Sequence, residues 1–459
     1  MNIKAHRFNK DNYIFLVLFH IAIGLLIFLF KPFAKVYFMI LMVYFIGRII
    51  LVSEEKKTQE VLLACAYFVG AEVFFRMTKA GLAYEASKYL VILFMLMGMF
   101  FKGISGKGYP YFLYLLLLFP AILVASVTLT YDANFRTNIA FVLSGPVCLG
   151  IAALFCYDRR VTQAQLLDII LYLALPCISL TTYLFFYSPS IKETLTGTAS
   201  NHAASGGFGP NQVATALGLG MTAMVIRFFM ASPTTILKAL NITIVIAMAY
   251  RAVVTFSRGG VIAALIVIAG FLWVLFLKSN GRQKNNIILS FMIFCMAMVV
   301  AWTISSNQSL GLIDKRYANE DAQGREKGDI TTGRTELFME EIDGFIHNPF
   351  LGIGASRGKN SRIEYEGRLL NSHNEIGRTL SEHGFLGILI FLILIIKPLA
   401  YRSTNKQNYY FYAFYFFWFA TINHSAMRIA APAFIYALCL LHVINEKTTL
   451  YRKQIKQQE

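Results

Sequence analysis

Three short motifs hold the side chains best suited to chemistry in this chain of 459 residues. The first has the sequence Phe-Ser-Arg-Gly-Gly over 256–260 and places Arg258 at the end of an apolar run. An isolated arginine at such a position commonly reaches the lipid headgroups as an interface anchor. The two glycines weigh against that interpretation, because glycine permits close backbone approach to another helix or to a ligand. Arg251 lies deeper in the same run, where a buried structural ion pair is the better prediction.

The second motif, Thr-Thr-Gly-Arg, ends at Arg334 and precedes a predicted amphipathic helix over 336–346. Thr332 is a suitable residue to cap that helix. Arg334 then lies in the first turn, where the helix macrodipole disfavours a cation. Either an anionic partner or a nearby acidic side chain, Glu336 or Glu340, would offset this cost, and the sequence leaves both explanations open.

The third motif, His-Asn-Glu, begins at His373. An isolated histidine is more often a hydrogen-bonded structural residue than a catalyst. His373 gains weight from its position at the end of a long polar loop, just before a predicted helix that re-enters the bilayer. The ordinary pKa of histidine suits a general base near neutral pH. The sequence lacks HExxH, CxxC, DxD and GxxxxGK[ST] patterns, so we predict no metal site, no cofactor and no ATP-driven transport.

The composition defines the elements that must position these residues. The chain is 57% hydrophobic and 15% charged, with a mean hydropathy of +0.57, whereas soluble proteins are about 45–50% apolar and about 25% charged. This excludes a typical globular enzyme and a disordered protein. It predicts an all-α integral membrane protein with about 12–14 transmembrane helices, because many runs are long enough to cross about 30 Å of hydrocarbon. The apolar segments are 13–30, 33–52, 61–77, 88–101, 110–130, 138–157, 164–187, 212–230, 236–256, 260–277, 286–305, 385–400, 408–422 and 429–445.

Two of these segments are weaker predictions than the others. Glu72 and Arg76 interrupt 61–77, and 88–101 is short. Whether both segments span the membrane is left open. Losing both would leave twelve helices and the same orientation of the chain ends.

The charge distribution predicts the orientation. The net charge is +17, which in a membrane protein reflects lysine and arginine retained on the cytoplasmic side rather than nucleic-acid binding. With a cytoplasmic N-terminus and a retained first helix, the loops on that side hold most of the short-loop cations. The positive-inside rule therefore places both termini in the cytoplasm.

The same topology places four polar features on the outer face of the membrane. They are the loop at 188–211, the corner at 257–260, the loop at 306–384 and the corner at 423–428. The loop at 306–384 holds ten Lys+Arg and thirteen Asp+Glu, so the positive excess lies elsewhere. A loop of this length is rarely an idle connector, and we expect short helices within it.

Four motifs, in order along the chain, resemble signatures of the O-antigen ligase and polymerase superfamily of bacterial membrane glycosyltransferases. The ligase-like signature is His373-Asn374 followed at the family's spacing by Gly384 and Gly387. The others are Gly207-Phe208-Gly209-Pro210-Asn211, Phe256-Ser257-Arg258-Gly259-Gly260, and Thr332-Gly333-Arg334 through Asn348-Pro349-Phe350-Leu351-Gly352-Ile353-Gly354. The resemblance covers about 205–395, and outside that range it is supported by hydropathy alone.

The resemblance implies four regions. Residues 1–205 form N-terminal transmembrane helices, and 206–305 form the central helices of the ligase-like core. Residues 306–384 form a large periplasmic loop, and 385–459 form the C-terminal helices and a basic cytoplasmic tail. The implied location is the bacterial inner membrane, with a periplasmic active site.

The resemblance also implies a reaction. A glycan moves from undecaprenyl diphosphate to an acceptor hydroxyl, either on lipid A-core or on a growing glycan. A lipid diphosphate is a stable leaving group, so the reaction needs cations around the diphosphate and a base for the hydroxyl. We assign the base to His373. The diphosphate contacts fall to Arg258, Arg334 and, as a weaker third, Arg428. Asn374 or Glu375 would orient His373 or the acceptor. The transfer is expected to be metal-independent and inverting.

The acceptor and even the class of protein leave alternatives. The signature around His373 favours a ligase over a polymerase that uses the same donor, and protein hydroxyls are a smaller possibility. A lipid-saccharide transporter is a remote alternative, because no internal repeat relates the two halves of the chain. A structural membrane scaffold has no positive support.

Overall fold

The computed structural model describes residues 10–444 except 131–132, 189, 191, 193–196, 332 and 368–370. Within those residues, ten helices are long and apolar enough to cross a membrane. The only named strands there, Arg160–Thr162 (β1) and His442–Ile444 (β2), pair in parallel. The predicted fold class, an all-α integral membrane protein, is confirmed.

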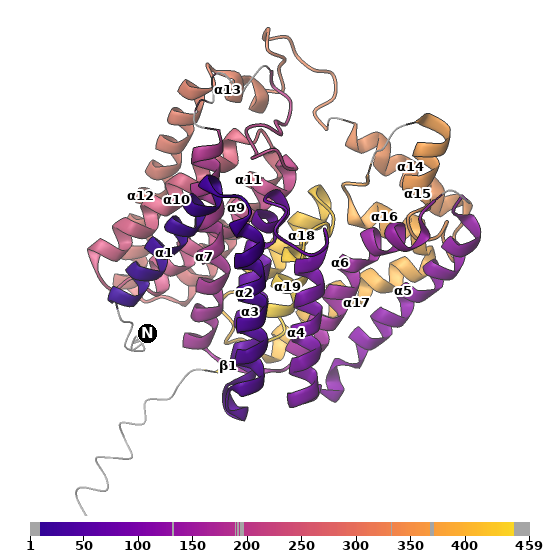
Figure 1. Cartoon of the computed structure of the whole chain (residues 1–459), viewed down its shortest axis with the longest axis horizontal. Coiled ribbons are helices and arrows are strands. Elements are labelled where there is room, and N and C mark those ends of the chain that lie inside the picture. The colour runs from indigo at the N-terminus through magenta and orange to yellow at the C-terminus, as the bar shows by residue number, and fades with distance from the viewer. Residues whose placement is uncertain are drawn as a thin grey trace, which may run out of the picture.

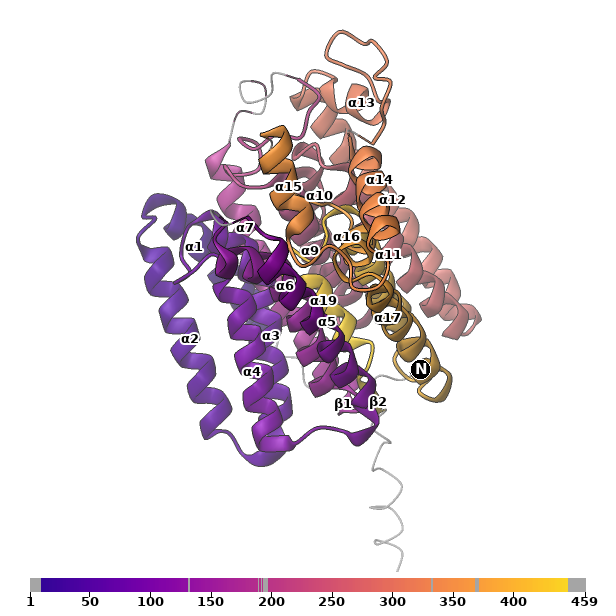
Figure 2. The ribbon, with the colours of Figure 1, turned by 90° about the vertical axis from the view of Figure 1, so that its right-hand side faces the viewer.

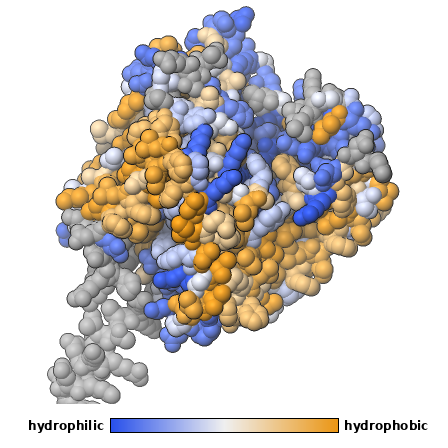
Figure 3. Space-filling model, viewed as in Figure 1, coloured by the Kyte–Doolittle hydropathy of each residue, from blue (hydrophilic) through white to orange (hydrophobic). Residues whose placement is uncertain are grey.

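The ten helices coincide with ten of the predicted apolar segments. Figure 3 shows hydrophobic surface on both sides of the molecule, below a hydrophilic upper end. They are α1 (Lys10–Leu29), α2 (Phe33–Leu51), α5 (Tyr109–Thr128), α6 (Phe135–Cys156), α7 (Gln163–Tyr187), α9 (Pro210–Met230), α10 (Thr235–Val254), α11 (Arg258–Lys278), α12 (Gly281–Gln308) and α17 (Phe385–Thr404).

The two weaker segments also form helices, α3 (Glu54–Met77) and α4 (Ala86–Lys102). Neither meets the length and hydropathy expected of a membrane span. α3 packs against α4 and α7, and almost every side chain from Glu60 to Arg76 is buried. Glu72 and Arg76, the charges that interrupt this apolar segment, are therefore buried in the bundle rather than exposed to lipid.

The last apolar segment differs from its prediction. Residues 429–445 do not form one long helix, because α19 spans only Ala431–Leu438 and β2 follows. Two side-chain amides explain the early stop. Asn408 Nδ2 donates to the Leu438 carbonyl and Asn405 Nδ2 donates to the Leu441 carbonyl, so these main-chain oxygens have partners outside a helix. α18 (Phe411–His424) precedes α19, and residues 425–430 between them are not part of a described helix.

The loop at 306–384 folds into four short helices, as expected. They are α13 (Leu312–Tyr317), α14 (Arg334–His347), α15 (Arg357–Glu366) and α16 (Glu375–His383). They lie at one end of the molecule, and the β1–β2 pair lies at the other (Figures 1 and 2). α14 begins two residues earlier than predicted. Its N-cap position is Gly333, which has a φ of 79°, and Thr332 lies outside the described residues.

The turn between α10 and α11 fixes the position of Arg258. Phe256 adopts a φ of 61°, an uncommon conformation for an aromatic residue, and its side chain is buried. α11 then packs directly on α9, because a Cβ at Gly260 would lie 2.7 Å from Ala214. The glycines of this motif thus serve close helix packing, one of the two roles predicted for them.

Candidate functional site: an arginine-lined cavity

A cavity of about 570 Å³ lies where the loop helices meet the end of α11. Its volume falls within the range of about 300–1,000 Å³ that ligand pockets occupy. Four predicted polar features contribute to this region. The 188–211 loop supplies Ser200, the 257–260 corner supplies Arg258, and the long loop supplies Arg334 and Asn374. Asn423, from the last corner, lines a smaller adjoining pocket that shares Arg334 and Asn374.

Three arginines line the cavity: Arg258, Arg316 and Arg334. No described lining residue is an aspartate or a glutamate. Burial first, and then the neighbouring guanidinium groups, lower the pKa values of Arg316 and Arg334. The cluster therefore holds three like charges with no carboxylate between them, which is an environment for an anion.

The three guanidinium groups differ in how much hydrogen-bonding capacity they retain. Arg258 donates to the carbonyls of Ile330, at 2.6 Å, and Arg316, at 3.4 Å. Arg316 Nε donates to the Phe256 carbonyl at 3.2 Å. The Arg334 guanidinium has no hydrogen bond to any described residue. Since a guanidinium carries five N–H donors, all three retain donors for a ligand.

Three helices begin at this cavity. Arg258 is the first residue of α11, Arg334 is the first residue of α14, and Asn374 is the N-cap of α16. Helix N-termini carry partial positive charge and unpaired N–H groups, so they add to the field of the arginines. The Tyr317 hydroxyl is also buried without a partner among the described residues. The arrangement can hold a group with multiple negative charges.

His373 lines the adjoining pocket together with Arg334 and Asn374. Ser257 Oγ donates to Asn211 Oδ1 at 2.7 Å, and the Asn211 amide lies 3.4 Å from His373 Nδ1. This orientation makes Nδ1 the acceptor, an assignment that follows from the hydrogen-bond network. The ring also bonds to the main chain of His424. Three of the resembling motifs are thus joined by one chain of hydrogen bonds.

The pKa of His373 differs from the ordinary histidine value assumed from the sequence. Burial, followed by the charges of Arg428 and Arg334, lowers the pKa of His373 to about 3. The imidazole is therefore neutral at pH 7 and able to accept a proton, but it is a weak base while those two charges are unopposed.

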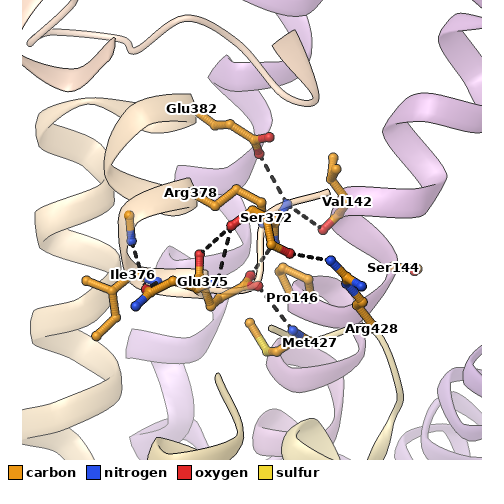
Figure 4. Close-up of polar contacts among 12 residues, drawn as sticks. Val142, Ser144, Pro146, Ser372, Glu375, Ile376, Arg378, Glu382, Met427 and Arg428 are labelled. Atoms are coloured by element: carbon orange, nitrogen blue, oxygen red, sulfur yellow. Dashed lines mark hydrogen bonds and ion pairs between the residues drawn. The ribbon is translucent and has the colours of Figure 1, made fainter. Parts of the chain in front are cut away.

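Asn374 and Glu375 make contacts that stabilise the fold around His373. Asn374 Oδ1 accepts hydrogen bonds from the Ile376 and Gly377 amides and so caps α16. The Glu375 carboxylate is fully buried, pairs with Arg378, and accepts from the Met427 amide at 3.1 Å (Figure 4). Glu375 therefore lies in a separate ion cluster and not in the arginine-lined cavity. Asn374 is the only one of the two that lines the cavity.

Arg428 also lies outside the large cavity. Its guanidinium donates to the carbonyls of Asn371, at 3.0 Å, and Ser372, at 2.6 Å, immediately before His373 (Figure 4). Burial lowers the pKa of Arg428 to about 10. The structure thus brings Arg258, Arg334 and Asn374 together, places His373 beside them, and puts Arg428 behind His373.

Sequence reasoning missed two residues of this site, and it mispredicted the contacts of Arg251, which lies outside the site. Arg316 lies in a short helix with neighbouring acidic residues and belongs to no motif. Asn211 belongs to the Pro-Asn stretch, but no role was predicted for it. Arg251 forms no ion pair with a described residue, contrary to the prediction, and its guanidinium donates instead to the carbonyls of Ser188 and Ala204.

Fold and site together define an integral membrane protein with an arginine-lined cavity at one end of its helices. Residues 243–392 match the family model described as O-antigen ligase, which confirms the resemblance over that segment. The matched segment, about a third of the chain, includes all three cavity arginines and His373. This family indicates a membrane glycosyltransferase-like enzyme that uses, in general terms, a lipid-linked glycan and an acceptor. No curated protein matches the chain.

Proposed function

We propose that the protein is an O-antigen ligase-like glycosyltransferase. It transfers a glycan from undecaprenyl diphosphate to a hydroxyl of lipid A-core at the periplasmic face of the bacterial inner membrane. The observation that carries the proposal is the cavity lined by Arg258, Arg316 and Arg334, with no carboxylate among its described lining residues, beside a neutral His373.

The proposed chemistry is a single displacement. The acceptor oxygen attacks the anomeric carbon of the glycan while the bond from that carbon to the diphosphate oxygen breaks. The electron pair leaves with the diphosphate, and His373 takes the proton of the hydroxyl. One displacement inverts the anomeric configuration. Negative charge grows on the leaving group, and guanidinium groups that are already in position stabilise it without reorganisation.

Donor binding also strengthens the base. The positive charge of Arg334 is among the causes that lower the pKa of His373. A diphosphate bound to Arg334 offsets that charge and raises the pKa of His373 toward its ordinary value. The histidine is then a better proton acceptor when the donor is present than when the site is empty.

The same site serves a polymerase if the acceptor is another lipid-linked glycan. The choice between the two acceptors is therefore made by experiment. Purified protein is incubated with undecaprenyl-diphosphate-linked glycan, with lipid A-core in one tube and with donor alone in another. Each tube is run with and without EDTA.

A glycan–lipid A-core product that survives EDTA and is lost in His373→Gln would support a metal-independent ligase. A ladder of lengthening products on undecaprenyl diphosphate would instead make the protein a polymerase. His347→Gln is the matched control, because His347 is an exposed histidine in the same loop and should keep full activity. Equal activity of His373→Gln and the wild type would contradict the assigned base.

A further inference from the structure

The segment 425–430 between α18 and α19 is a short stretch of irregular backbone inside the protein. Ala426 has a φ of 52°, and five of its six residues are buried. Main-chain groups that are buried away from water need hydrogen-bond partners. The groups that meet this need here are mostly ionic.

Three charged side chains bind the main chain of this segment. Glu375 accepts from the Met427 amide, as described above. Glu72 of α3 accepts from the Ala430 amide at 2.6 Å. Arg76, one turn further along α3, donates to the Arg428 carbonyl at 2.9 Å. Residues at 72 and 430 are thus joined directly, although they are far apart in the sequence.

Glu72 and Arg76 belong to a buried set of four charges. Arg76 pairs with Glu72 at 2.5 Å and with Glu85 at 2.6 Å, and Lys88 pairs with Glu85 at 2.6 Å. Two negative and two positive charges balance, and none of the four side chains is more than 9% exposed. Buried ion pairs rarely add net stability compared with apolar packing, so the fold alone does not explain why this cluster is ionic.

The contacts continue from this cluster to the site. Arg76 holds the carbonyl of Arg428, and the Arg428 guanidinium holds the carbonyls of Asn371 and Ser372. His373 is the next residue. Two hydrogen-bonded steps therefore connect a charge on α3 to the main chain that carries the proposed base.

We propose that Glu72 and Arg76 are positioning residues for His373, acting through the 425–430 segment and Arg428. The proposal rests on the proposed function, because it assumes that the position of His373 limits the transfer. It assigns Arg428 to holding the histidine, in place of contact with the diphosphate.

The charged and titratable groups around His373 agree with this route. They are Arg428 from the 425–430 segment, Arg334 and Glu341 from α14, and His424 from α18. Arg428 is the charge with the largest effect on the pKa of His373 after burial. Displacing Arg428 therefore changes both the place and the proton affinity of the imidazole.

The test uses the full-length protein in lipid nanodiscs and the variant Arg76→Lys. Lysine keeps the buried charge balance, so the variant retains the ion pairs that folding needs. A single ammonium group cannot reproduce the fork that contacts Glu72, Glu85 and the Arg428 carbonyl together. Glu72→Gln and Arg428→Lys interrupt the same route at its two ends and serve if Arg76→Lys does not fold. Glu60→Gln is the matched control. Glu60 also lies on α3, twelve residues before Glu72, and pairs with Arg48 outside the cluster.

Two readouts separate positioning from general damage. The first needs no substrate: the rate at which diethyl pyrocarbonate modifies His373, measured by peptide mass spectrometry with exposed His347 as an internal reference. The second is kcat and KM for the lipid-linked donor. We expect Arg76→Lys to increase the rate at which His373 is modified and to leave the rate for His347 unchanged. We also expect kcat to fall by roughly 10–100-fold with KM unchanged, because Arg258, Arg316 and Arg334 still hold the donor.

The outcomes separate the two proposals. Wild-type modification rates and kcat in Arg76→Lys would overturn the positioning role. A changed KM at constant kcat would overturn it as well, since that result assigns the residues to donor binding. If the wild type transfers no glycan while Arg76→Lys still exposes His373, the proposed function fails and the structural link stands.

Discussion

Arg334 is the most direct test of the arginine-lined cavity, because its guanidinium has no hydrogen bond to any described residue. Replacing it by glutamine should therefore leave few broken contacts in the empty protein. If Arg334 binds the diphosphate, the variant loses charge-assisted hydrogen bonds worth about 1.5–3 kcal/mol. At about 1.36 kcal/mol for each factor of ten, kcat/KM for the donor should fall by roughly 10–150-fold.

The same substitution should change the pH dependence. The transfer needs a neutral imidazole, so kcat/KM falls as the pH drops below the pKa of His373 in the free enzyme. In the wild type that pKa is about 3, and kcat/KM should be flat across the acidic range in which the protein stays folded. Removing the charge of Arg334 raises the pKa of His373, and the acidic fall of kcat/KM moves to higher pH. It stays below the ordinary histidine value, because burial is the largest cause of the shift.

The assay is initial-rate transfer across a pH series from about 4 to 8, with donor concentration varied at each pH. Arg325→Gln is the control, since Arg325 lies in the same loop, is 76% exposed, and pairs only with Asp321 at the surface. Exposed pairs of this kind contribute little, so this variant should match the wild type. An Arg334→Gln enzyme with unchanged kcat/KM, or one whose only defect is in acceptor KM, would refute the assignment of the cavity to the diphosphate.

Three further predictions follow from the site and the turn beside it. Asn211→Asp should keep the contact with Ser257 but place a carboxylate oxygen, an acceptor, against His373 Nδ1. The carboxylate should raise the pKa of His373, so kcat/KM should fall at acidic pH where the wild-type value does not. Gly384→Ala should lower the thermal unfolding temperature, because Gly384 has a φ of 61° and an added Cβ would lie 2.5 Å from a main-chain oxygen; Gly281→Ala, with open space around it, is the control. EDTA should leave initial rates unchanged, and a rate restored only by a divalent cation would contradict the metal-independent mechanism.

The membrane helices were largely predictable from the sequence because hydrophobic length is a one-dimensional property. Every predicted apolar segment contains a described helix, and the boundaries of the ten spans differ by a few residues. The exception at 429–445 depends on Asn405 and Asn408, whose amides reach the end of α19 from another segment. The apolar residues at 429–445 alone do not predict these contacts.

The site was only partly predictable for the same reason. Arg258 and Arg334 were identified because a cation at the start of a helix is a local anomaly that one segment reveals. Arg316 carries no such signal, since neighbouring acidic residues offer it obvious partners that the fold does not use. For Glu375, adjacency to His373 in the sequence suggested a shared role, whereas the first turn of α16 directs its carboxylate to Arg378.

Two charge clusters, one within α16 and one around the cavity, differ in whether the fold supplies their counter-charges. In one, Glu375 and Glu382 bracket Arg378, so the buried guanidinium has its counter-charges within the fold. In the other, burial and then the charges of Arg258 and Arg334 lower the pKa of Arg316, burial and Arg258 lower the pKa of Arg334, and no described lining residue supplies a negative charge. The repulsion within this second cluster destabilises the empty protein. Because an anion that binds only the folded state recovers that free energy on binding, we expect the substrate to supply the missing charge and the cavity to prefer a group that carries more than one negative charge.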